Sequence, residues 1–187
     1  EAPERDLYEL ARSLVLKTSD PIPEVVNPDP VSYSEGRRDT FWIVDTTRVR
    51  TFTTEATLRL VSPHAYWYIE DGNSVSDRNI VNAARAFEEE IYPKVTETFG
   101  TEWTPGVDND EHMTILHARL EGVLGYFSAV DEYPSSVHPN SNQREMIYLN
   151  VGSMDIGSSE YLAVLAHELQ HAVHWSGDPT EETWVSE

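Results

Sequence analysis

Residues 166 to 175, AHELQHAVHW, place His167 and His171 four positions apart, with Glu168 directly after the first histidine. On an α-helix, residues four apart differ by about 40° around the axis and by roughly 6 Å along it, so both imidazoles can bind one ion. Zn²⁺ accepts imidazole nitrogen at about 2.0–2.1 Å. Glu168 lies about 100° further round, where it can contact a metal-bound water. The spacing predicts zinc-dependent hydrolysis with Glu168 as general base; the alternative is two hydrogen-bonded histidines on a half-buried helix.

A third metal ligand has to come from another part of the chain. His174 lies about 10 Å of helix rise from His167, too far to share a zinc ion, so we expect a structural role for it. The following residues, SGDPTEETWVSE (176–187), predict a turn and then a second helix. We predict Glu187 as the third ligand. The acidic alternatives in the same segment are Asp178, Glu181 and Glu182.

The sequence around the two histidines predicts both the N-terminal cap of their helix and its buried face. Ser158 and Ser159 can cap its N-terminus, and Glu160 is favourable in the first turn. An apolar stripe follows on one side, at Leu162, Leu165, Leu169 and Val173.

Strands and one further helix are predicted upstream. The segments FWIVD (41–45), TFTTEATLRLV (51–61) and AYWYIE (65–70) predict neighbouring strands. Residues 77–100 predict a helix that Ser76 can cap, that Gly100 stops and that Pro93 kinks or ends. HMTILHARL (112–120), GYFSAV (125–130, entered through Gly125) and EMIYLNV (145–151) predict three more strands. This order favours an α+β fold.

The first forty residues differ in character from the rest. Residues 4–17, ERDLYELARSLVLK, repeat apolar positions at helical spacing and predict a short amphipathic helix. The prolines that follow, at 21, 23, 28 and 30, favour an extended segment. We therefore divide the chain into an N-terminal helix and Pro-rich arm (1–40) and one domain (41–187).

The composition of the chain restricts the classes of molecule that it can bind. The chain has 13 basic and 33 acidic residues, a net charge of −20, which disfavours nucleic acid as a partner. It has no cysteine, so a metal must be held by His, Asp or Glu. No stretch has the roughly 20 apolar residues of a membrane span. We expect an exported protein, extracellular or at the cell surface, with its signal peptide already removed.

Together, AHELQH and EETWVSE resemble the signature of the gluzincin zinc metallopeptidases, and within them a hyicolysin-like group. The resemblance covers roughly residues 112–187. It implies a zincin-like subdomain, built from a mixed sheet, a backing helix and an active-site helix. It implies His167, His171 and Glu187 as zinc ligands, Glu168 as general base and acid, and a peptide or protein substrate bound along GYFSAV. The alternative for GYFSAV is an ordinary strand of the sheet. Gluzincins continue into a second subdomain, so the resemblance also implies truncation after Glu187 and completion by a further subdomain or chain.

Two further interpretations stay open. GVDNDEHM (106–113) concentrates the oxygen ligands that Ca²⁺ prefers, but it lacks the spacing of a calcium loop and favours a polar turn before a strand. The whole chain is alternatively a zinc-containing binding or assembly module without catalytic activity. The remaining histidines have no partner at metal spacing, and we expect them at the surface or in packing: His64, His112, His117 and His138.

Overall fold

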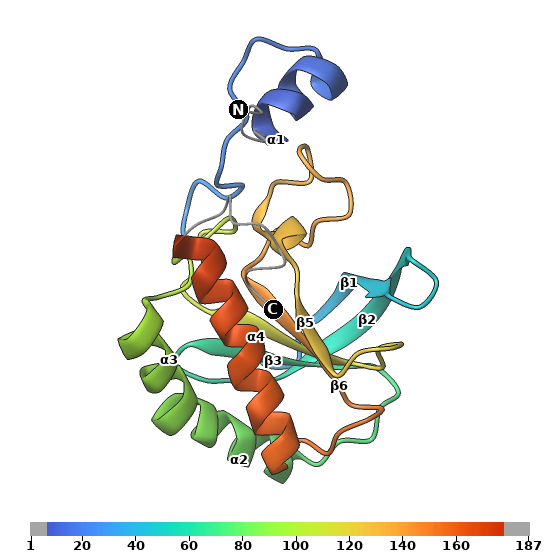
Figure 1. Ribbon diagram of the computed structural model, residues 1–187, viewed down its shortest axis with the longest axis vertical. Helices are drawn as coiled ribbons and strands as arrows, with labels where there is room; N and C mark the ends of the chain where they lie inside the picture. Colours follow the sequence, from blue (N-terminus) through green and yellow to red (C-terminus); the bar gives the residue numbers. More distant parts are fainter. Residues whose placement is uncertain (1–6, 178–187) are drawn as a thin grey trace.

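Six strands form one mixed sheet in the computed structural model, which describes residues 7–177 (Figure 1). The strand order is β1-β2-β3-β4-β6-β5. Neighbours are antiparallel except for β3 with β4 and β4 with β6, which are parallel. The bounds are β1 Arg38–Asp45, β2 Arg50–Val61, β3 Ala65–Glu70, β4 Met113–Ala118, β5 Gly125–Phe127 and β6 Met146–Asn150. The predicted α+β class is confirmed, and 41–70 do form neighbouring strands.

The central strands follow from their sequences. All residues of β4 and β6 are buried, as expected for parallel strands covered on both faces, and both sequences are almost continuously apolar. In β2, by contrast, only Ala56 and Leu58 are buried, and its register with β3 shifts between Leu58 and Leu60. At the other edge of the sheet β5 has only three residues, and a 3₁₀ turn at Ala129–Glu132 follows it.

A long backing helix precedes β4. It consists of α2 (Asp77–Ala86), a π-helical turn (Phe87–Ile91) and α3 (Tyr92–Phe99). The irregular turn ends at Ile91, two positions before Pro93, whose missing N–H would otherwise leave a gap in regular hydrogen bonding. Pro93 therefore does not end the helix, which stops at Gly100 as predicted. Ser76 is the residue before the helix, but its side chain makes no capping hydrogen bond with any described residue.

The backing helix packs against one face of the sheet, and so does α4 (Ser159–Gly177), which carries the histidine motif (Figure 1). The core on this side joins strand residues such as Trp67, Ile115 and Leu149 to Phe87 and Leu165 of the helices. A second core occupies the other face, around Tyr68, Leu116 and Tyr148, with Tyr33 of the arm packed against it. The arm residue is therefore part of the packed structure.

The N-terminal helix forms as α1 (Leu7–Leu10) and a π-helical continuation (Ala11–Leu16). It lies at one end of the molecule (Figure 1). Its apolar stripe is not buried: Leu14 is 68% and Val15 69% exposed, while Ala11 is buried. The arm that follows is held by backbone hydrogen bonds, from Val26 to the carbonyl of Val107 (2.8 Å) and from Val31 to that of Asn109 (3.2 Å).

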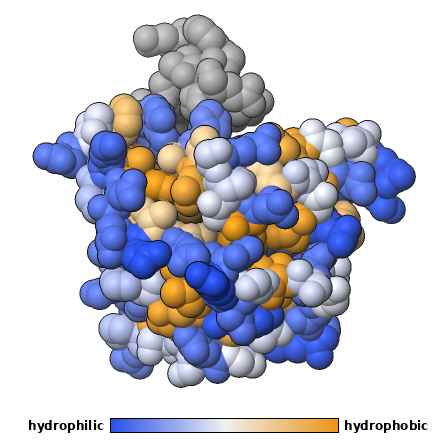
Figure 2. Space-filling model, turned by 90° about the horizontal axis from the view of Figure 1, so that it is seen from below, coloured by the Kyte–Doolittle hydropathy of each residue, from blue (hydrophilic) through white to orange (hydrophobic). Residues whose placement is uncertain are grey.

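The outer surface is predominantly hydrophilic on the face shown in Figure 2, where apolar side chains form small separate groups. This agrees with the large negative charge of the chain. None of the described helices is both long and apolar enough to cross a membrane.

Candidate metal centre

The helix α4, which carries the histidine motif, is held by a serine cap at its N-terminus and by a buried apolar face. The backbone N–H of Tyr161 donates to Ser158 Oγ at 3.2 Å, which confirms a serine cap. Leu165, Leu169 and Val173 of the predicted stripe are fully buried, and Leu162 is partly buried. This packing turns the opposite side of the helix, with its polar residues, away from the core.

A buried hydrogen bond connects α4 to the sheet. His117 of β4 has no exposed surface, its Nδ1 lies 2.9 Å from the carbonyl oxygen of Tyr68, and its Nε2 lies 2.7 Å from the Tyr161 hydroxyl. Burial lowers the pKa of His117 to about 4, so it is neutral at physiological pH. His117 is thus a packing residue, as expected, and it sets the position of α4 over β4.

The two motif histidines face each other. His167 Nε2 and His171 Nε2 are 3.0 Å apart, and the ring planes meet at 87°. His167 is exposed and His171 is half-buried. The helical spacing therefore brings together the two nitrogen donors that the sequence predicted, at an accessible position on α4.

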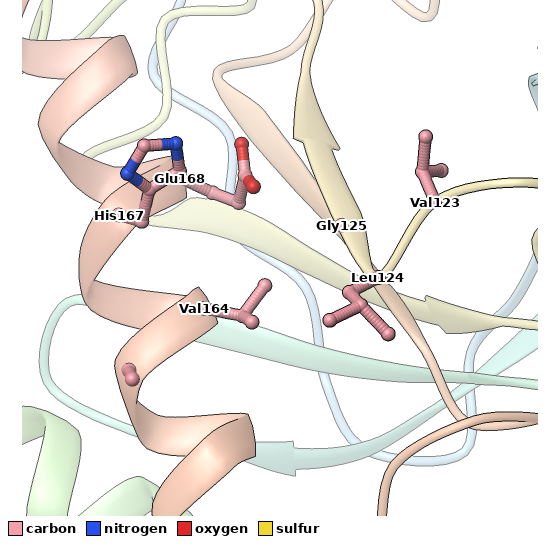
Figure 3. Close-up of a pocket in the computed structure, with 7 residues that line it drawn as sticks. Val123, Leu124, Gly125, Val164, His167 and Glu168 are labelled. Atoms are coloured by element: carbon pink, nitrogen blue, oxygen red, sulfur yellow. The ribbon is translucent and has the colours of Figure 1, made fainter. Parts of the chain in front are cut away.

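Glu168 differs from its neighbour in being buried, with 5% of its surface exposed. Figure 3 shows its side chain extending from α4 toward β5. Burial raises the pKa of its carboxyl to about 7, and a hydrogen bond from the backbone N–H of Phe127 opposes that rise. A carboxyl of this kind is suited to exchanging protons near neutral pH.

A groove lies beside Glu168, between α4 and β5 (Figure 3). Its volume is about 450 Å³, and its lining residues are Val123, Leu124, Gly125, Ala163, Val164, His167 and Glu168. The groove is therefore lined by apolar residues except for His167 and Glu168. Within the described chain β5 is an edge strand that pairs only with β6.

Gly125 allows the close approach of β5 to α4. A Cβ placed on it would lie 2.8 Å from the Tyr148 carbonyl oxygen, 2.8 Å from Val164 Cγ1 and 3.2 Å from Glu168 Cγ. A larger residue would push the strand away from the helix. The sequence contained a signal of this close approach, because a glycine within a strand often marks a site where another segment comes near, and Gly125 begins GYFSAV.

The segment that leads into β5 is braced from both sides. The side-chain amide nitrogen of Asn150 donates to the carbonyl oxygens of Leu120 (2.8 Å) and Val123 (2.7 Å). The backbone N–H of Asn150 donates to the carbonyl oxygen of Leu124 (2.8 Å). Asn150 is 3% exposed. Its position directly after the apolar run MIYL was the only signal of this role in the sequence.

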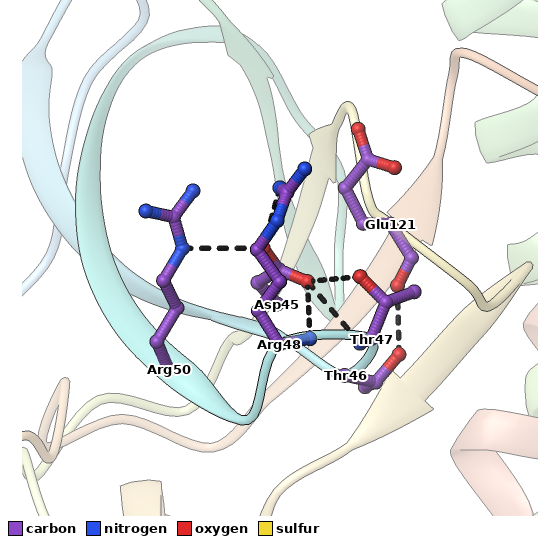
Figure 4. A network of polar contacts seen from close by, with 6 residues as sticks. All are labelled: Asp45, Thr46, Thr47, Arg48, Arg50 and Glu121. Atoms are coloured by element: carbon purple, nitrogen blue, oxygen red, sulfur yellow. Dashed lines mark hydrogen bonds and ion pairs between the residues drawn. The ribbon is translucent and has the colours of Figure 1, made fainter.

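The second brace is the turn between β1 and β2 (Figure 4). The Thr46 hydroxyl donates to the Glu121 carbonyl oxygen at 2.7 Å. The turn itself is built on Asp45, which accepts hydrogen bonds from Thr47, Arg48 and Arg50. These bonds, led by that from the Thr47 hydroxyl, hold the pKa of Asp45 well below its ordinary value.

The predicted third ligand, Glu187, lies outside the described residues, as do its alternatives Asp178, Glu181 and Glu182. Within residues 7–177, no three His, Cys, Asp or Glu side chains are grouped so that they could hold a metal ion. The described part of the site therefore consists of two histidines and the adjacent carboxyl.

The other sequence candidates have local partners. The His174 ring packs edge-on against Phe99, with the centroids 5.6 Å apart, in keeping with a structural role. His64 Nδ1 lies 2.6 Å from a Glu88 oxygen, and His112 Nδ1 lies 2.8 Å from Asp110. The acidic stretch before β4 does form a turn. Asp108 and Asp110 are both buried in it.

The chain was compared with models of protein families and with curated proteins, and it matches none of them. The function therefore has to be argued from the geometry around His167, Glu168 and His171.

Proposed function

We propose that this chain is a zinc-dependent metalloendopeptidase of the gluzincin type, with a zincin-like fold, which hydrolyses peptide bonds outside the cell. The observation that carries the proposal is the pair of imidazole nitrogens 3.0 Å apart on α4, next to the buried carboxyl of Glu168. The proposed ligands are His167, His171 and Glu187, and Glu168 is the proposed general base.

The two histidines fit a zinc ion. Two nitrogens at about 2.0–2.1 Å from one tetrahedral ion lie about 3.3 Å from each other, which requires only a small adjustment of the observed separation. Both rings can reach the same point because they stand on successive turns of one helix. When bound, zinc supplies a water of lowered pKa at this position.

In this proposal Glu168 accepts a proton and returns it. Its pKa of about 7 allows it to take a proton from water and to pass it to the departing amine. The Phe127 N–H holds the carboxyl in place beside β5. Because the side chain is 5% exposed, little solvent competes for that proton.

The substrate would bind along β5. An edge strand offers main-chain hydrogen bonds to an extended peptide, and the groove of Val123, Leu124 and Val164 offers an apolar surface next to Glu168. An extended peptide added there would run past the reactive groups of α4. This arrangement supports an endopeptidase that acts on extended segments of a polypeptide.

Zinc content tests the metal site. Elemental analysis of the full chain, purified without chelator, is expected to give one zinc per chain for wild type and none for the double variant His167→Ala, His171→Ala. His174→Ala is the matched control, since it removes a histidine of the same helix that packs on Phe99. Circular dichroism confirms that all three are folded. Zinc in neither wild type nor control would refute the metal site.

The variant Glu168→Gln separates metal binding from catalysis. It is expected to retain zinc and to lose hydrolysis of a peptide library, because the amide cannot accept the proton. Continued cleavage at the wild-type rate would refute the role of Glu168. Stoichiometric zinc in wild type with no cleavage of any peptide would instead favour the zinc-containing binding or assembly module.

A further inference from the structure

A second cavity lies at the C-terminal end of α4, apart from the groove beside β5. Its volume is about 290 Å³. It is lined by four aromatic residues, two acidic residues and one serine: Tyr8, Trp103, Tyr133, Trp175, Glu24, Glu132 and Ser176. We refer to it as the aromatic cavity. Its walls come from the N-terminal helix, the arm, the segment after α3, the turn after β5, and α4.

The rings stand at angles to each other rather than in a stack. Trp103 and Trp175 have centroids 6.1 Å apart and planes at 44°, and Tyr133 meets Trp175 at 6.0 Å and 80°. Tyr8 lies 5.6 Å from Tyr133, with planes at 52°. Aromatic side chains arranged in this way can present ring faces to a shared space from several directions, and ring faces attract cations.

Glu132 adds a buried carboxyl that shares a hydrogen bond with Glu145 and leaves one oxygen without a partner within the described chain. It is 2% exposed, and its Oε2 has no hydrogen-bond partner among the described residues. The strongest electrostatic influences on it come from other carboxyls, those of Glu145, Asp131 and Asp108. Burial, reinforced by these neighbours, raises the pKa of Glu132 well above its ordinary value. Burial among carboxyls favours the protonated form of Glu132, and a cation bound beside it would favour the carboxylate and form an ion pair with it.

We propose that the aromatic cavity binds an organic cation, the ammonium or guanidinium group of a lysine or arginine side chain. Ring faces and carboxyls together favour a cation over a neutral group of the same size. A volume of about 290 Å³ is at the lower end of the range for ligand sites, which suits one side chain. The net charge of −20 also favours the approach of basic peptides. The proposal does not depend on metal binding or peptidase activity.

The indole N–H signals of the tryptophans provide a direct test. The ¹⁵N-labelled full chain would be titrated with Nα-acetyl-lysine amide and Nα-acetyl-arginine amide, and with tetramethylammonium to recognise a site for quaternary ammonium. Nα-acetyl-norleucine amide is the neutral control. The signals of Trp103 and Trp175, assigned through phenylalanine substitutions, are expected to shift with the cations, while those of Trp42 and Trp67 stay in place.

Two variants examine the parts of the cavity separately. Trp103→Ala should weaken binding about tenfold, because loss of a partly desolvated cation–π contact of about 1.4 kcal/mol corresponds to that change. Glu132→Gln should also weaken it, whereas Trp42→Ala, which alters a tryptophan of β1, should leave binding unchanged. A response to tetramethylammonium alone would assign the cavity to quaternary ammonium compounds. Equal binding of the norleucine control, or shifts confined to Trp42 and Trp67, would overturn the proposal.

Discussion

Replacement of Gly125 by alanine tests whether β5 must approach α4 closely. The new Cβ would lie 2.8 Å from both the Tyr148 carbonyl oxygen and Val164 Cγ1. The carbonyl belongs to the partner strand β6, so it cannot rotate away as a side chain would, and β5 itself has to move. Overpacking of this kind costs about 1–3 kcal/mol. For a chain of this length, that corresponds to a fall in Tm of about 2–12 °C.

The movement of β5 should also affect Glu168, because its carboxyl accepts a hydrogen bond from the Phe127 N–H. Peptide hydrolysis by Gly125→Ala, measured well below its Tm, is therefore expected to fall further than the small unfolded fraction explains. Gly177→Ala is the matched control, since no described atom lies within 4 Å of its added Cβ. Thermal denaturation followed by circular dichroism measures both. Wild-type Tm and activity in Gly125→Ala would refute the reasoning.

Three further predictions concern the supports of the site and the acidic interior. Asn150→Ala leaves one buried and one partly buried carbonyl without this donor and should lower the free energy of unfolding by about 2–3 kcal/mol in urea denaturation; a loss below about 0.5 kcal/mol would contradict this role. Tyr161→Phe leaves His117 Nε2 without its hydrogen-bond partner and should lower the free energy of unfolding by about 1–3 kcal/mol in the same assay. An unchanged free energy of unfolding would contradict this prediction. Burial raises the pKa of Asp131 from 3.8 to about 7, so stability that is full below the ordinary value is lost as pH rises through 7. Asp131→Asn, in chelator-treated protein, should flatten this decline between about pH 4 and pH 7; an equally steep decline would show that other groups cause it.

The elements with strong local patterns were predicted well. The apolar stripe and serine cap of α4 follow from helical periodicity, and the strands β3, β4 and β6 follow from short apolar runs. The expectation that Pro93 kinks or ends a helix took no account of a π-helical turn that ends at Ile91, two positions earlier. The exposure of Leu14 and Val15 shows that apolar periodicity predicts a helix without stating what covers it.

Long-range placement was not predictable from local patterns. Nothing in the sequence orders β6 between β4 and β5, and that order is what puts β5 at the edge beside α4. His117 could have been suspected as a hydrogen-bonded core residue, since it interrupts the apolar run of a strand. Its partner Tyr161 lies 44 positions away, and only the fold brings the two together.

Under the proposed function, metal binding and proton transfer depend on different parts of this fold. His167 and His171 meet because both belong to one helix, so their pairing requires little beyond a stable α4. The environment of Glu168 also requires β5, which in turn is held by Asn150 and by Thr46 of a turn about 75 residues earlier. Substitutions that displace β5 should therefore reduce hydrolysis while zinc content is retained. The motif in the sequence accounts for the two proposed histidine ligands, whereas the raised pKa of the carboxyl between them is a property of the tertiary structure.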